Sequence, residues 1–209
     1  MDTRWLEDFL ALAQTRSMLA TWLAKQRVLL GRSRVDILTG ELASVAARLE
    51  EGSIDLLLGY HHPVIASNLD AQRFRFVTIA QDRLVPVMRS DAGMRAAPAV
   101  PKAKPVRFLA YARTLALGRL VADHLERSGT PVALDTVVHC DSPDALHALA
   151  LAGIGMTWLP WCMVAADCKA KRLVQWRGHG DEVHFEVRLW RAKGRLPATA
   201  EALWNQAVP

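Results

Sequence analysis

An amphipathic helix followed at once by a nearly continuous apolar run constrains the fold most strongly. The helix is predicted over residues 41–52, where four apolar residues fall on one stripe: Leu42, Val45, Ala46 and Leu49. Gly52 is placed to end this helix. The apolar run IDLLLGY (54–60) is typical of a strand that is covered on both faces. With the extended segment RVDILT (34–39) before the helix, the pattern predicts a parallel sheet with helical crossovers.

The same alternation of strands and helices continues along the chain. Residues 73–89 form an extended stretch that is long enough to leave one lobe and enter another. A segment rich in Pro, Ala and Lys at 96–105 predicts a surface loop, and further strands are predicted at 106–112 and 132–140. A return near 173–183 makes a second crossing. We therefore expect an α/β protein of two Rossmann-like lobes, joined by two crossover segments, with a cleft between them.

The clearest local signal lies in residues 141–160. Ser142 is suited to cap a helix, Pro143 fits the first helical position, and Asp144 complements the positive end of the helix. Gly153 is placed to close this helix. The chain then returns as a strand.

Composition indicates a globular protein with a mild positive charge. Of the 209 residues, 51% are hydrophobic and 22% are charged, which excludes a disordered chain. The net charge of +5 is dispersed, so its basic clusters are interpreted as solvated faces, with phosphate binding as the alternative. Those clusters are Arg27, Arg32 and Arg34, and Lys102, Lys104 and Arg107. Without a long apolar run or a secretory leader, the sequence predicts a cytoplasmic protein.

The residue patterns of enzymes and metal sites are absent from the sequence. There is no G-x-S-x-G motif, phosphate-binding loop or pair of carboxylates at catalytic spacing, so we expect neither an enzyme nor a cofactor. The three cysteines, Cys140, Cys162 and Cys168, lack zinc spacing and are expected to be buried structural thiols. His61 and His62 are adjacent in an extended segment and project in opposite directions, so no metal site is expected there.

Three segments resemble the LysR-type transcriptional regulators, in the order in which that family carries them. Residues 3–17 (TRWLEDFLALAQTRS) resemble the first helix of the family's helix-turn-helix, and residues 49–60 resemble a βα unit of its effector domain. Residues 148–164 (ALALAGIGMTWLPWCMV) resemble a late segment of the same domain. The hypochlorite-responsive branch is the most similar, on two short patterns: Tyr60-His61-His62 and Tyr111…Gly118-Arg119-Leu120. The resemblance implies a bilobal domain like the periplasmic binding proteins.

Compared with that family, the chain has a junction near Ser17–Met18 at which a long segment of the family's sequence is absent. The sequence leaves no room there for the rest of the winged helix-turn-helix, the linker helix or the first strand of the sensor. We therefore expect a helix remnant at 1–17, effector lobe I at 18–83 and 174–209 without its first strand, and lobe II at 84–173. A recognition helix is needed to read DNA, so no residue is assigned to DNA binding.

Ligands of open α/β sheets sit outside the carboxyl ends of the strands, where helix N-termini favour anions. This rule selects effector-binding candidates from both lobes: Thr39, Gly40, Tyr60, His61, Tyr111, Arg113, Thr114, Cys140, Asp141, Ser142, Gly155 and Met156. The alternative for Thr39 and Ser142 is that they only cap helices.

Four residues are candidates for redox sensing. Cys140 precedes a helix N-terminus, which stabilises a thiolate. The resemblance to hypochlorite-responsive proteins adds three methionines: Met88, Met156 and Met163. The alternative for these methionines is that they fill the core.

The function predicted from the sequence is transcription regulation, by a non-enzymatic effector-binding domain of the LysR type. Its expected partners are a small-molecule effector, with an anion favoured, and a second chain. That chain is either an identical copy in a homodimer or a full-length paralogue in a mixed dimer. The alternative is a free-standing small-molecule binding module or a non-functional truncated remnant.

Overall fold

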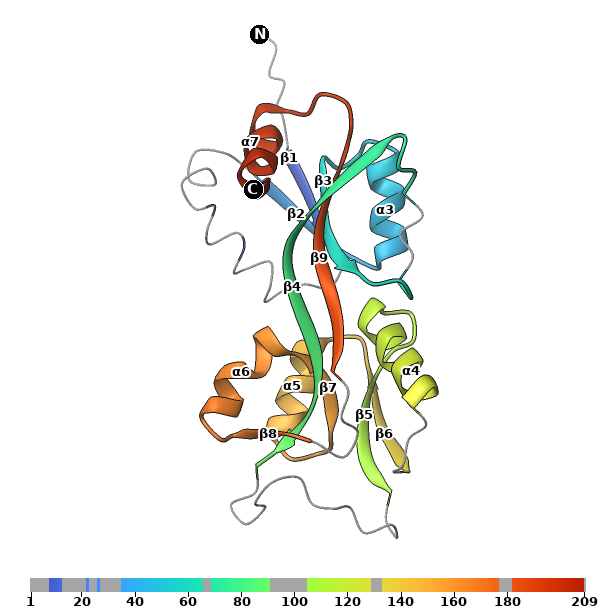
Figure 1. Cartoon of the computed structure of the whole chain (residues 1–209), viewed down its shortest axis with the longest axis vertical. Coiled ribbons are helices and arrows are strands. Elements are labelled where there is room, and N and C mark those ends of the chain that lie inside the picture. Colours follow the sequence, from blue (N-terminus) through green and yellow to red (C-terminus); the bar gives the residue numbers. More distant parts are fainter. Residues whose placement is uncertain are drawn as a thin grey trace. The chain divides into compact units, whose positions relative to one another are not determined.

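The computed structural model describes residues 8–12, 22, 26, 35–65, 69–90, 105–128, 133–176 and 182–208. The chain divides into two compact units (Figure 1). Unit 1 comprises residues 1–81 and 186–209, and unit 2 comprises residues 82–185.

Unit 1 is a mixed sheet with helices. Its elements are β1 (Asp8–Leu12), β2 (Val35–Thr39), α3 (Leu42–Glu50), β3 (Leu56–His61), the first part of β4 (Phe74–Arg89), most of β9 (Val183–Ala192) and α7 (Ala198–Ala207). The strand order is β2-β1-β3-β9-β4. β1 is parallel to β2 and β3, and β9 is antiparallel to β3.

The structure corrects the prediction that the first strand of the sensor is missing. Residues 8–12, expected within a helix, form β1, which lies between β2 and β3. β1 pairs along its whole length with β2, from Asp8↔Val35 to Leu12↔Thr39. The physical reason is that a gap at the centre of the sheet would leave backbone N–H and C=O groups unpaired, and the apolar segment DFLAL satisfies them. The remainder of the expected helix, at 1–7 and 13–17, lies outside the described residues.

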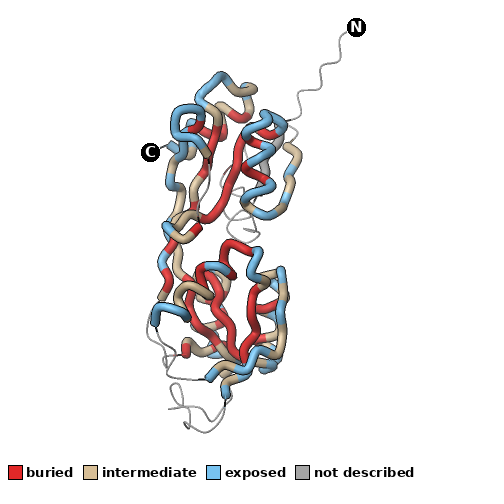
Figure 2. The backbone as a smooth tube through the Cα atoms, turned by 90° about the vertical axis from the view of Figure 1, so that its right-hand side faces the viewer, coloured by how far each residue is buried: buried red, intermediate tan, exposed pale blue. Residues whose placement is uncertain are grey.

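The core of unit 1 forms between α3 and the sheet. The helix predicted at 41–52 is confirmed: Val45, Ala46 and Leu49 are buried and Leu42 packs beside them. They contact Leu57, Phe74 and Trp190, among others. Burial of a Leu, Val or Phe side chain contributes about 1.5–3 kcal/mol, so this cluster fixes α3 on the sheet. Figure 2 shows the buried residues concentrated in the strands of the unit.

Unit 2 is a second α/β layer structure. Its elements are the end of β4, β5 (Val106–Tyr111), α4 (Ala116–Ser128), β6 (Leu134–Cys140), α5 (Pro143–Leu151), β7 (Thr157–Pro160), α6 (Trp161–Lys169), β8 (Leu173–Gln175) and the start of β9. β5 and β6 are parallel, and the end of β4 is antiparallel to β7 and β8. β5 also bonds the residue before β7, because Leu109 N donates to Met156 O at 2.8 Å.

The boundaries between the units differ from those predicted at one crossing. The first crossing lies between residues 81 and 82, close to the predicted 83–84. The second lies between residues 185 and 186, just beyond the return predicted near 173–183, whereas lobe I was expected to resume at 174. The cause is β8, which pairs with the end of β4 through contacts such as Val174↔Met88 and so holds residues 173–175 in unit 2.

Candidate functional site

The candidates of unit 1 lie at one edge of its sheet. Thr39 and Gly40 follow β2, and Tyr60 and His61 end β3. β2 and β3 are both parallel to β1, so their carboxyl ends share this edge. Tyr60 is buried, whereas Thr39 is exposed.

The surroundings of His61 at this edge disfavour its charged form. His61 lies opposite Glu186 of β9, with Arg188 nearby on the same strand. Burial, and next the positive charge of Arg188, lower the pKa of the His61 imidazole. Its Nδ1 atom is buried and has no hydrogen-bond partner within the described part of the chain. His62 faces other partners, since its Nδ1 accepts from Val64 N at 3.2 Å.

In unit 2 the ends of β5 and β6 meet. Tyr111 pairs with Cys140, and Ala112 N donates to Cys140 O at 2.9 Å. The loops that follow carry four further candidates: Arg113 and Thr114 before α4, and Asp141 and Ser142 before α5. The structure therefore brings these six candidates to one edge of the sheet.

Two of these candidates have structural roles as well. The predicted cap is confirmed, because Ser142 Oγ accepts from Ala145 N at 3.3 Å at the start of α5. The Cys140 thiol accepts from Ser142 N at 3.4 Å and lies 3.6 Å from Ser142 O. Both side chains thus fix the turn between β6 and α5.

Gly155 and Met156 are not brought to this edge. Met156 forms a parallel bridge with Phe108, three residues before the carboxyl end of β5, and is fully buried. Gly155 has a packing reason, since a Cβ there would lie 2.8 Å from Arg107 O. The two residues therefore join strands inside the unit.

The remaining redox candidates lie on separate elements. Met88 is on β4 and Met163 is on α6, and both are half-buried. The expectation that all three cysteines are buried is wrong: Cys140 and Cys168 are half-buried, and Cys162 is exposed on the first turn of α6. Burial, and next the charge of Asp167, raise the pKa of the Cys168 thiol. That thiol is therefore a poor thiolate former.

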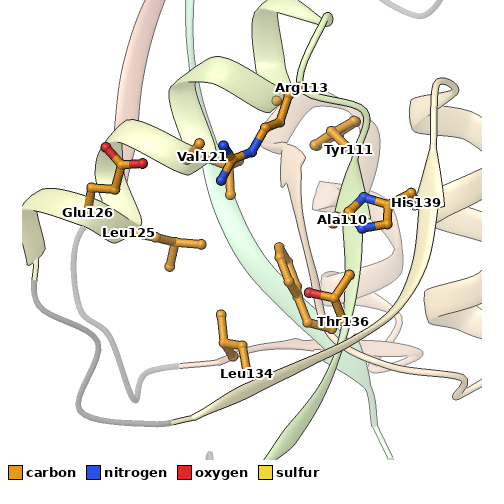
Figure 3. A pocket seen from close by; sticks show the side chains of 12 residues that line it. Ala110, Tyr111, Arg113, Val121, Leu125, Glu126, Leu134, Thr136 and His139 are labelled. Carbon is orange, nitrogen blue, oxygen red and sulfur yellow. The ribbon is translucent and has the colours of Figure 1, made fainter.

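A cavity of about 360 Å³ opens between α4 and the strands β5 and β6 of unit 2 (Figure 3). Twelve residues line it: Phe108, Ala110, Tyr111, Arg113, Gly118, Val121, Ala122, Leu125, Glu126, Leu134, Thr136 and His139. We call it the α4 pocket. Its size and its mixture of apolar and polar groups are typical of small-molecule sites. Only two of the predicted candidates, Tyr111 and Arg113, contribute to it.

The α4 pocket includes His139 because β6 is irregular. The register shifts after the pair Phe108↔Thr136, so that Leu109 lies opposite Val138 and Ala110 opposite His139. One extra residue in β6 moves His139 to the face that carries Thr136, whereas strict alternation would turn it to the other face. Sequence reasoning missed His139 for this reason. A helical stripe could have indicated the contribution of α4, since Gly118, Val121, Ala122 and Leu125 follow i, i+3, i+4, i+7 spacing.

The two units of mixed α/β structure, with a ligand-sized pocket, define an effector-binding domain like the periplasmic binding proteins. Residues 10–208 match the LysR substrate binding domain family. The chain belongs to this family. The family is one of regulator domains rather than enzymes, which agrees with the expectation from the sequence.

Two relatives carry regulatory names. The HTH-type transcriptional regulator YjiE of Escherichia coli K12 is 24% identical over 160 residues, which are 76% of this chain and 50% of YjiE. The HTH domain-truncated transcriptional regulator QseD of Escherichia coli O157:H7 is 24% identical over 160 residues, 76% of this chain and 63% of QseD. The chain thus aligns with half to less than two thirds of these relatives.

The fold matches that of a solved regulatory domain. The apo form of the regulatory domain of HypT from Salmonella typhimurium superposes with a TM-score of 0.83 and 21% sequence identity. The match covers 99% of this chain and 96% of that domain. At this identity the likeness establishes the fold and says nothing of the ligand. Among the described helices, none combines the length and apolarity needed to cross a membrane.

Proposed function

We propose that this chain is a ligand-responsive regulatory subunit that acts on transcription through a second LysR-type chain. It binds a small anionic effector and pairs either with its own copy or with a full-length paralogue that supplies the DNA reader. The observation that carries the proposal is the α4 pocket with Arg113 at its rim, in a chain that belongs to an effector-binding family.

Two comparisons support this proposal. The relative QseD is named as an HTH domain-truncated transcriptional regulator. Two solved domains with similar folds, CcmR of Synechocystis and QuiR, are in complex with the small molecules 2-PG and shikimate, respectively. These comparisons favour a chain of this fold that binds a small molecule, and the effect on a promoter is proposed to come from an intact partner chain.

Pairing with a paralogue is tested by co-expression. The tagged chain is produced with a full-length LysR-type paralogue from the same genome, and the purified material is analysed by light scattering. We expect a mixed dimer whose promoter affinity in a gel shift differs from that of the paralogue homodimer. The chain alone should show no sequence-selective binding. Failure to form any mixed or homodimeric species, or tight sequence-selective binding by the chain alone, would contradict the proposal.

The pairing surface is proposed to include unit 1. β2 stands at the end of the described strand order and exposes Ile37, which is 43% accessible. Replacing Ile37 by Lys should weaken association, because a charge at an exposed sheet edge opposes pairing. Ile154→Lys is the matched control, since Ile154 is an exposed apolar residue of unit 2. Equal effects of the two variants would argue against this surface.

A further inference from the structure

We propose that the α4 pocket selects a monocarboxylate with an unbranched hydrocarbon tail, the carboxylate pairing with Arg113. This inference rests on the proposed function, effector binding, and names the ligand class of that site. It follows from the chemistry along the pocket, which runs from the cation Arg113 to an apolar end at Leu134.

The middle of the α4 pocket is apolar on three sides. Phe108 and Ala110 come from β5, and Leu134 from β6. Val121, Ala122 and Leu125 of α4 form the third side. Leu125 and Leu134 are only partly buried although they face the pocket, so a hydrocarbon tail placed there removes their exposed surface from water.

Arg113 supplies the cationic end. It lies in the loop between β5 and α4, and Figure 3 shows its side chain reaching over the pocket toward Val121. Within the part of the chain that the structure describes, Arg113 makes no ion pair with an acidic side chain. A guanidinium binds a carboxylate through two parallel hydrogen bonds, which is the strongest pairing that an uncommitted Arg offers.

His139 stands at the same end as Arg113. It lies opposite Ala110 near the carboxyl ends of β5 and β6, on the pocket face because of the irregular register of β6. Figure 3 shows its ring beside Ala110. An N–H of this imidazole can donate to the second oxygen of a carboxylate held by Arg113. A bulge that re-aims a polar side chain into a cavity is a common device at functional sites.

Leu134 makes the end of the pocket that is remote from Arg113 apolar (Figure 3). Glu126 does not lie at that end: it is exposed on α4, on the same side of the pocket as Val121. A second carboxylate on the ligand would lie against the apolar end and would lose hydration without gaining a cation. The pocket therefore discriminates against dicarboxylates.

The test uses isothermal titration calorimetry with three ligands of eight carbons, octanoate, octanol and octanedioate, and with the four-carbon butyrate. We expect octanoate to bind most tightly, since each added methylene that enters the pocket raises affinity about fourfold. Octanol lacks the carboxylate, and octanedioate would place its second carboxylate against the apolar end at Leu134, so each should bind at least about tenfold more weakly than octanoate.

Three variants locate the binding site. Arg113→Gln should weaken octanoate about tenfold or more, whereas the control Arg119→Gln, at an exposed position on α4, should leave it unchanged. Glu126→Gln should leave the preference for octanoate over octanedioate unchanged, because Glu126 does not lie at the end of the pocket that is remote from Arg113. A circular dichroism melt of each variant shows that the chain remains folded.

Several results would overturn the inference. They are no binding of octanoate at millimolar concentration by the folded chain, equal binding by Arg113→Gln, and equal binding of octanoate and octanedioate by the unaltered chain. A dimer that Leu125→Arg dissociates, and that does not bind octanoate, would show that a second copy fills the pocket. Pairing with the paralogue is measured separately. Lost octanoate binding with intact pairing therefore rejects this ligand class alone, and failure to pair rejects the proposed function.

Discussion

Arg191 holds α7, the last helix of unit 1, in place. Only 1% of this side chain is exposed, and its guanidinium donates to both carboxylate oxygens of Glu201, at 2.6 and 2.7 Å. It also donates to the backbone oxygens of Gly194 and Ala192. Arg191 is the last residue but one of β9 and Glu201 lies on α7, so this contact fixes the last helix to the sheet.

We predict that Glu201→Gln destabilises the chain, because it leaves the buried Arg191 cation without its counter-charge. The midpoint of urea unfolding should fall, as measured by far-UV circular dichroism. Glu51→Gln, a substitution of the same kind at an exposed position after α3, should leave the midpoint unchanged. Equal midpoints for the two variants would mean that the ion pair contributes nothing.

The same contact predicts a dependence on pH. Hydrogen bonds from Arg191, and next from the Leu196 backbone, lower the pKa of Glu201 from 4.5 to about 2. The folded pKa is below the unfolded one, so the contribution of the pair is complete above pH 4.5 and is lost as pH falls toward 2. The difference in urea midpoint between wild type and Glu201→Gln should shrink across this window. A difference that stays constant from pH 6 to pH 2.5 would refute the assignment.

A glycine is required at position 118 because the backbone of a neighbouring residue lies too close for a Cβ atom, and not because of the backbone conformation of Gly118 itself. A Cβ at this position would lie 2.3 Å from Ala112 O and 3.1 Å from Tyr111 Cβ. Gly118→Ala should therefore cost about 1–3 kcal/mol, the usual price of overpacking. Gly194→Ala is the control, since a Cβ there meets nothing within 4 Å, and should change stability by less than about 0.5 kcal/mol. Chemical denaturation of both variants measures the difference; equal values would contradict the packing argument.

Among the secondary-structure elements, the helices could be predicted where residues at their ends favour helix termination. Gly52 and Gly153 were expected to end helices, and both have the positive φ, +74° and +76°, that favours glycine at such positions. β1 was not predictable, because residues 8–12 carry an apolar pattern that suits a helix or a strand. Whether these residues form a helix or a strand depends on the gap between β2 and β3 that a strand can fill, and both of these strands lie far from residues 8–12 in the sequence. Nothing in the residue types of β6 indicates its register shift.

The strand at residues 8–12 can be tested by removing one backbone donor. Ala11 pairs with Leu38 on one side and Leu57 on the other. Ala11→Pro should destabilise unit 1 by about 3 kcal/mol or more, since proline lacks the N–H and is excluded from central strands. Ala11→Ser keeps the N–H and should have a much smaller effect. If both variants melt at the wild-type temperature, residues 8–12 do not form a central strand.

For the whole molecule, each unit has apolar residues that pack within it. α3 packs on Leu57 and Trp190 in unit 1, and in unit 2 Phe108 meets Trp158 edge-on, with ring centroids 5.7 Å apart. The crossing between residues 81 and 82 was predictable to within a few residues from the long extended stretch at 73–89. The second crossing was not, because a three-residue strand such as β8 is too short to recognise in a sequence.

Separate cores predict that damage stays within one unit. Glu201 belongs to unit 1 and Gly118 to unit 2. In hydrogen-exchange mass spectrometry under native conditions, Glu201→Gln should raise exchange in α7, β3 and the later residues of β9, and leave α4 and β5 protected. Gly118→Ala should do the reverse. The reason is that cooperative opening units follow contiguous packing rather than chain order, and β4 and β9 each run through both units. If either variant raised exchange in both units equally, the two cores would open as one, and β4 and β9 would then be the elements that couple them.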